Sequence, residues 1–167
     1  MYSGNHHNLG YDDIYAYNLS RKMLKIITDI ADPLLDYTKD DPVRPEISRE
    51  FRVARHRFVA ALVDDTPRAM VCVSLRDMIP STVDELGDNC NLPTTAIFYT
   101  IWSYSGGAAG RLIFATADAI RKDFPSVTRF VTLSPKTEMA RKFHLRNGAT
   151  VFRENQDTIN YEYLLQL

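Results

Sequence analysis

The amino-acid sequence predicts an α/β (α+β) fold: a mixed, mostly antiparallel twisted sheet with helices on both faces. Short runs of β-branched and aromatic residues alternate with apolar stripes at helical spacing. Two pairs of strand-like runs flank short polar turns, which is typical of hairpins, and a strand-helix-strand order in between predicts a parallel crossover. With 167 residues the chain has the size of one domain. We therefore assign 1–167 to a single domain and expect residues 1–10 to form a disordered tail.

The N-terminal part of the chain is predicted to contain two helices. Apolar residues recur at helical spacing over 11–30, and Asp32-Pro33 would end this helix. A polar, proline-containing link over 36–45 leads to a second, short helix that begins near Pro45. Two helices are thus expected before the first strand.

The rest of the chain alternates strands, turns and helices. A polar turn separates the first two strands, and a run of glycines joins the third strand to a long helix. Gly148 stands where a C-terminal helix cap is expected. We expect the following order: strands at 57–63 and 69–75, a surface loop at 80–93, a strand at 95–103, a helix at 109–124, a strand at 127–133, a helix at 136–147, and a closing hairpin of 149–153 with 158–165.

Composition argues against several classes of partner. The formal net charge is −1, so no general positive field would attract nucleic acid. The N-terminus lacks the apolar core of a signal peptide, and no stretch approaches a membrane span, so we expect no membrane partner and a cytoplasmic location. Two cysteines match no zinc-site spacing, and we expect no metal. A local basic cluster is interpreted as a solvated helix face because acidic residues interrupt it: Arg49, Arg52, Arg55 and Arg57.

The glycine turn after the strand at 95–103 is a candidate anion site. A turn of small residues at a helix N-terminus leaves backbone N–H groups unpaired at the positive end of the helix dipole, which suits a diphosphate. Arg111 adds a cation nearby. The alternative is that the same small residues only allow close packing of strand and helix.

This turn resembles the GNAT superfamily pattern, Arg/Gln-x-x-Gly-x-Gly/Ala, which binds coenzyme A. Gly107 and Ala109 occupy its last two places, whereas Tyr104 stands in the first, so the cradle is expected to come from the backbone. The resemblance implies a GNAT-like acyl-CoA acyltransferase fold with a coenzyme A thioester as substrate. It implies these contacts: Ile101, Trp102, Ser103, Tyr104, Ser105, Gly106, Gly107, Ala108, Ala109, Gly110 and Arg111.

Three later blocks resemble malonyl-CoA decarboxylases, in the same order: 130–135 (FVTLSP), 143–149 (FHLRNGA) and 160–164 (NYEYL). The resemblance implies that Ser134 and His144 are the catalytic pair. An imidazole titrates near neutrality and suits protonation of the enolate left by CO2, while Ser134 would orient the malonyl carboxylate. Backbone N–H groups over 101–103 would form the oxyanion hole. The resemblance also implies a helical domain before these blocks and a longer stretch between the last two of them, and neither is found in residues 1–167.

Several alternatives stay open. His144 can be an ordinary helix histidine, Ser134 a helix cap, and Trp102 a packing residue rather than a wall of an acyl pocket. The chain can decarboxylate malonyl-CoA or a related thioester, transfer an acetyl group from acetyl-CoA to an amine or thiol, or bind coenzyme A without turnover. The expected partner is a small-molecule acyl-CoA, and a homodimer through a strand edge is a further hypothesis.

Overall fold

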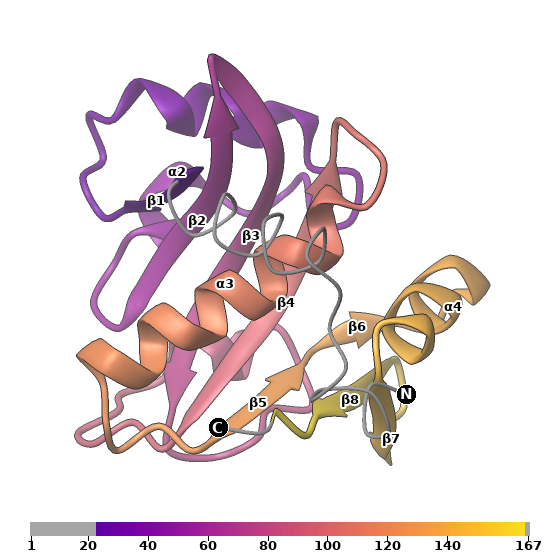
Figure 1. Ribbon diagram of the computed structural model, residues 1–167. Helices are drawn as coiled ribbons and strands as arrows, with labels where there is room; N and C mark the ends of the chain where they lie inside the picture. Colours follow the sequence, from indigo (N-terminus) through magenta and orange to yellow (C-terminus); the bar gives the residue numbers. More distant parts are fainter. Residues whose placement is uncertain (1–22, 166–167) are drawn as a thin grey trace.

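The computed structural model describes residues 23–165, which build an eight-stranded sheet in the order β1-β2-β3-β4-β5-β8-β6, with β7 paired to β8 (Figure 1). The pairs are antiparallel except β4 with β5, which run parallel. This confirms the predicted mixed, mostly antiparallel sheet. The strands are β1 (Leu24–Ile27), β2 (Arg57–Asp64), β3 (Thr66–Arg76), β4 (Thr95–Ser103), β5 (Arg129–Thr132), β6 (Ser134–Pro135), β7 (Ala149–Glu154) and β8 (Thr158–Tyr163).

Helices cover both faces of the sheet, as predicted. Along one face runs α3 (Ala108–Asp123), which buries Leu112 and Ile113 against β2, β3 and β4 (Figure 1). The other face buries Leu35 and Leu86 from two 3-10 helices, η3 (Pro33–Asp40) and η4 (Asp84–Gly87), and packs against α2 (Arg49–Arg52). The last helix, α4 (Glu138–Arg146), lies beside β7. The sheet therefore separates two apolar cores.

The predicted helix over 11–30 is wrong at its C-terminal end. Residues Leu24–Ile27 form β1, which pairs antiparallel with β2, and residues 11–22 lie outside the described part of the chain. Ile26 and Ile27 are β-branched and suit a strand, so pairing with the edge of the hairpin outweighs the helical spacing. The link predicted over 36–45 also contains the end of η3, which the Asp32 side chain caps at Leu34 N–H.

The arginine cluster is not the solvated helix face that we expected from the sequence. The side chain of Arg52 is 1% exposed and pairs with the buried Asp41 carboxylate at 2.8 Å. Arg57 donates its Nε to the carbonyl of Phe51 and lies 4.2 Å from the centre of that ring. Charge alternation in the sequence cannot distinguish a solvated arginine from one that a distant carboxylate pairs. Arg55 is exposed, as predicted.

The loop over 80–93 is tied to the sheet and does not line the cleft described below. Ser74 and Arg76 of β3 donate to the carbonyl of Leu86, whose side chain is buried. From β8, Asn160 donates to the carbonyl of Pro80 at 3.0 Å. Asn160, the first residue of the 160–164 block, therefore holds this loop against the sheet.

The start of α3 packs closely on the end of α4. A Cβ on Gly110 would collide with the carboxamide oxygen of Asn147. The Nδ2 of the same Asn147 donates to the carbonyl of Phe143 at 2.8 Å. Gly110 is therefore required by packing, the alternative that the sequence left open for this turn.

We expect Gly110→Ala to destabilise the fold by about 1–3 kcal/mol, because overpacking a close contact displaces the neighbouring side chain. Asn147→Ala combined with Gly110→Ala should recover part of this loss, since it removes the group that the new methyl meets. Thermal unfolding of the four proteins of this cycle measures the coupling. Purely additive losses would contradict the assignment.

Candidate active site

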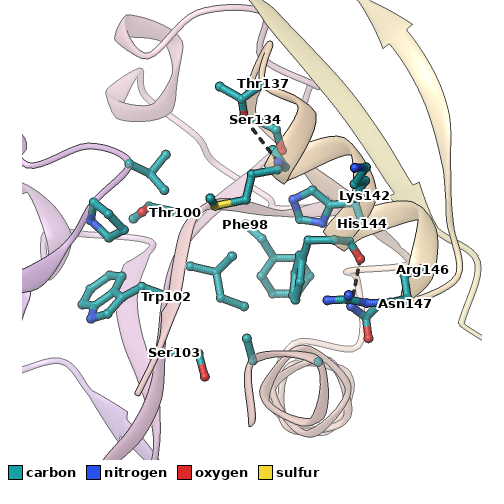
Figure 2. A pocket seen from close by; sticks show the side chains of 18 of the residues that line it. Phe98, Thr100, Trp102, Ser103, Ser134, Thr137, Lys142, His144, Arg146 and Asn147 are labelled. Atoms are coloured by element: carbon teal, nitrogen blue, oxygen red, sulfur yellow. Dashed lines mark hydrogen bonds between the residues drawn. The ribbon is translucent and has the colours of Figure 1, made fainter. Parts of the chain in front are cut away.

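A cleft of about 1000 Å³ lies where β4 separates from the chain segment that follows β5. Figure 2 shows Thr100, Trp102 and Ser103 from β4 along one side, and Ser134 and His144 from the β6 and α4 side of the cleft. The floor and walls also include the glycine turn. Of the predicted site residues, the lining contains Ile101, Trp102, Ser103, Tyr104, Ser105, Gly106, Gly107, Ala109, Gly110, Ser134 and His144.

The cleft exists because β4 pairs with β5 only over its first four residues. The parallel register joins Thr95–Phe98 to Arg129–Thr132, and the Leu133 N–H makes a further bond to the Phe98 carbonyl at 3.1 Å. At the same point β4 has one residue more than β3, because Thr100 faces Cys72 whereas Phe98 faces Val73. Such a bulge bends a strand and commonly lies beside a functional site.

Beyond the bulge, β4 presents an open edge to the cleft. Tyr104 donates its N–H to the carbonyl of Arg68 at 2.8 Å, on the β3 side. Because N–H groups alternate along a strand, those of Ile101 and Ser103 point toward the opposite, open edge. Both amides lie in the stretch 101–103, from which we predicted the oxyanion hole.

The glycine turn borders the same cleft. Gly107 is the N-cap of α3 with φ 75°, and no side chain caps this helix. The N–H of Ala108 donates to the carbonyl of Ser105 at 3.3 Å and that of Arg111 to the carbonyl of Gly107 at 3.4 Å, whereas the amides of Ala109 and Gly110 between them receive no side-chain cap. The Nη1 of Arg111 lies 3.1 Å from where a Cβ of Gly107 would stand. An uncapped helix N-terminus with a nearby guanidinium suits an anionic ligand.

Two predicted contacts lie outside the lining among the described residues. Ala108 is fully buried in the core under the turn, and Arg111 lies at the helix surface beside it. The sequence did not separate these two residues from their neighbours, because the residues of a helix that face a cleft depend on how the helix is rotated against the sheet.

Tyr104 has its hydroxyl engaged by protein groups. It accepts from Trp102 Nε1 at 3.0 Å and donates to Asp40 Oδ2 at 2.8 Å, and its ring meets Tyr37 edge-on. Burial is the main cause that raises the pKa of Tyr104 to about 12. The residue in the first place of the motif therefore fixes Trp102. For Trp102 the sequence left open a packing role and a place in the pocket wall; the residue has both, since it packs in the core and lines the cleft.

Ser134 is buried at the cleft in the short strand β6. Its hydroxyl donates to the hydroxyl of Thr132 at 2.7 Å, and the same Thr132 oxygen accepts the N–H of Tyr161. Thr137, rather than Ser134, caps α4, because its side chain accepts from Ala140 N–H. The helix-cap alternative for Ser134 is therefore wrong.

His144 is 4% exposed and is held by aromatic side chains. Its ring stacks on Tyr161 with centroids 5.0 Å apart and meets Phe143 edge-on. Its Nδ1 lies 2.7 Å from the hydroxyl of Tyr163. Burial raises the pKa of Tyr163, so this hydroxyl stays protonated and can donate a hydrogen bond to Nδ1. That pairing favours the tautomer in which Nε2 carries the hydrogen.

The imidazole does not keep an ordinary pKa. Burial lowers the pKa of His144 to about 4, so the ring is neutral at pH 7. From the sequence we expected the unperturbed pKa of about 6.5, and the burial of the ring makes that expectation wrong. Protonation of His144 near neutrality requires an additional negative charge beside the ring.

This shift predicts a loss of stability in acid. The unfolded chain protonates this histidine below about pH 6.5, whereas the folded protein resists protonation until about pH 4, so stability falls as the pH is lowered through that window. The expected contribution is on the order of 3 kcal/mol. Chemical unfolding at pH 7 and pH 4.5 should show a smaller acid loss in His144→Gln than in the wild type. Equal losses in both proteins would mean that the ring titrates normally.

Sequence reasoning missed part of the lining. Two cations that line the cleft, Lys142 and Arg146, come from α4. Pro42 and Val43 approach from the link before α2, for which the sequence holds no signal. Lys142 and Arg146 are four residues apart and share one side of α4, but each stands two residues from His144, so the helical period alone does not place them with it.

Comparison with known proteins identifies the fold class. The GNAT domain of S. lividans PAT matches with a TM-score of 0.63 at 17% identity, covering 84% of this chain and 88% of that one. The crystal structure of malonyl-CoA decarboxylase from Agrobacterium vitis matches with a TM-score of 0.58 at 26% identity, covering 80% of this chain and 40% of that one. The decarboxylase structure from Rhodopseudomonas palustris gives 0.64 at 20%, covering 92% and 64%. The fold is GNAT-like, as predicted.

A family model identifies the family within this fold class. The malonyl-CoA decarboxylase C-terminal domain matches residues 39–161. The chain belongs to this family and spans less than two thirds of the length of the two decarboxylase structures. No curated protein matches. Within residues 23–165, no group of three or more metal-ligating side chains occurs, and no helix is long and apolar enough to cross a membrane.

Proposed function

We propose that this domain binds malonyl-CoA, or a closely related thioester, and decarboxylates it. The observation that carries the proposal is the placement of Ser134, His144, the open edge of β4 and an uncapped glycine turn around one cleft. Membership of the decarboxylase family supports the same reaction. The cleft volume of about 1000 Å³ is at the upper end for small-molecule sites, which suits a ligand as long as coenzyme A.

In this proposal the diphosphate lies at the amides of the first turn of α3, with Lys142 and Arg146 available to its phosphates. The thioester carbonyl faces the N–H groups of Ile101 and Ser103. The hydroxyl of Ser134 has one proton to donate, and it exchanges its bond to Thr132 for a bond to the malonyl carboxylate. A fixed donor at the developing oxyanion is worth about 10²–10³ in rate.

The bond between the carboxylate and the α-carbon then breaks. Its electron pair passes to the α-carbon and is delocalised onto the thioester oxygen as an enolate, while CO2 leaves. His144 gives a proton to the α-carbon and yields acetyl-CoA. Since the imidazole is neutral in the empty cleft, we propose that it takes up this proton when the anionic acyl group binds, because a nearby negative charge raises the pKa of a buried imidazole.

The experiment is incubation of the protein with carboxyl-labelled malonyl-CoA without any acceptor. Release of labelled CO2 together with acetyl-CoA supports decarboxylation. Release of free coenzyme A that depends on an added amine or thiol would instead indicate an acyltransferase. Binding without either product would indicate a coenzyme A-binding domain and would overturn the catalytic roles of Ser134 and His144.

A further inference from the structure

Arg44 lies outside the cleft lining but contacts the backbone on both sides of the gap that forms it. It belongs to the segment between η3 and α2 and is 8% exposed. Its Nε donates to the carbonyl of Tyr99 at 3.0 Å, and its Nη2 donates to the carbonyl of Leu133 at 3.0 Å. One guanidinium thus bridges β4 and the segment that leads from β5 to β6.

The gap between the strands creates the need for this bridge. Regular pairing ends at Phe98 with Thr132, so the carbonyls of Tyr99 and Leu133 lie just beyond the last ladder bonds. Buried carbonyls are nearly always paired, and a planar guanidinium can serve two acceptors at once. Lysine presents a compact ammonium and does not reproduce this fixed fork.

The two carbonyls adjoin the groups to which we assign the chemistry. Tyr99 is the extra residue at the bulge, immediately before the open edge that carries the N–H groups of Ile101 and Ser103. Leu133 directly precedes Ser134. The position of Arg44 therefore sets the separation between the proposed oxyanion donors and the proposed carboxylate donor.

A buried network holds Arg44 in place. The Oδ1 of Asp41 accepts the N–H of Arg44 at 3.0 Å and the hydroxyl of Thr100 at 2.7 Å. The Oδ2 of Asp41 pairs with Arg52, which also donates to the Arg44 carbonyl at 2.9 Å. The Asp41 side chain is fully buried and that of Arg52 is 1% exposed. These partners fix the backbone of Arg44, from which the guanidinium reaches its two carbonyls.

We propose that Arg44 is a positioning residue: it fixes the width of the cleft between β4 and Ser134 and so aligns both sets of donors on one acyl group. This inference rests on the proposed decarboxylation and goes beyond it, because Arg44 touches neither the cleft nor the acyl group and acts through two carbonyls. The contrasting role is that of a structural cross-link without effect on chemistry.

The test compares Arg44→Lys with Arg76→Lys as a matched control. Arg76 is 1% exposed and also donates to backbone carbonyls, those of Leu86 and Asp88, but it holds the loop over 80–93 rather than the cleft. At a temperature where both variants are folded, Arg44→Lys should lower kcat for malonyl-CoA at least 10-fold with KM within about threefold, whereas Arg76→Lys should leave kcat within about twofold. Arg44→Gln, which also removes the charge, should lower kcat further.

A second readout does not need turnover. The Leu133 amide bonds to Phe98 at the last position before the gap, and Arg44→Lys should speed its hydrogen exchange at least 10-fold, while Arg76→Lys should not. Equal kcat values for the two lysine variants, or unchanged exchange at Leu133, would overturn the positioning role. If the wild-type protein released no CO2, the proposed function would fail. The exchange rate of the Leu133 amide in Arg44→Lys would still show whether Arg44 holds β4 and Leu133 together: faster exchange would mean that it does, and unchanged exchange that it does not.

Discussion

His144→Gln is expected to lower kcat for malonyl-CoA about 10³-fold while leaving the affinity for free coenzyme A within about threefold. Glutamine can donate a hydrogen bond but cannot deliver a proton, and general acid catalysis contributes about 10²–10⁴ in rate. The coenzyme should still bind, because its phosphates are assigned to the turn at Gly107 and to Lys142 and Arg146, none of which this variant changes. Steady-state kinetics and thermal shift with coenzyme A measure the two effects.

The matched control for this variant is His56→Asn. His56 lies before β2 with φ 62°, a conformation that asparagine tolerates, and it does not line the cleft. Its replacement should leave kcat unchanged. A His144→Gln protein that turns over malonyl-CoA as fast as the His56→Asn protein would remove the imidazole from the mechanism.

Gly106→Ala is expected to weaken coenzyme A binding about 10- to 100-fold without loss of stability. A Cβ on Gly106 meets nothing within 4 Å in the empty protein, so the fold can accept it. The same methyl would occupy the space that we assign to the diphosphate, and steric overlap of this kind costs about 1–3 kcal/mol. Calorimetric titration with coenzyme A measures the affinity, and thermal unfolding measures the stability.

Gly110→Ala serves as the comparison within the same turn, since its cost falls on packing against Asn147. Wild-type affinity in the Gly106→Ala protein would mean that the diphosphate binds elsewhere. Opposite patterns in the two variants, one losing affinity and the other losing stability, would separate the two roles that small residues play here.

Local patterns in the sequence carried most of the fold. The strand at 95–103 and the hairpin of β7 with β8 follow from β-branched and aromatic runs between polar turns, and Gly148 adopts φ 96° as a helix-terminating glycine. β1 was missed because its four residues become a strand only by pairing with β2. The burial of Arg52 was missed for a similar reason, since its partner Asp41 lies in another element.

The candidate site divides in the same way. Ser134, His144 and the glycine turn were predicted from short motifs, and all three line one cleft. Such motifs can be found in the sequence because each lies within, or directly after, a single strand or helix. The pKa of His144 could not be read from the sequence, since it depends on burial against Tyr161 and Tyr163. Arg44 carries no local signal either: its two acceptors lie 55 and 89 residues away.

Thermal unfolding with malonyl-CoA, acetyl-CoA and free coenzyme A tests most directly whether this cleft is a coenzyme A thioester site. Each ligand at 100 times its dissociation constant should stabilise the folded protein by about 2.7 kcal/mol. We expect a shift with all three, and a lower dissociation constant for malonyl-CoA than for acetyl-CoA because its carboxylate meets Ser134. An unfolding curve that none of the three displaces would contradict it.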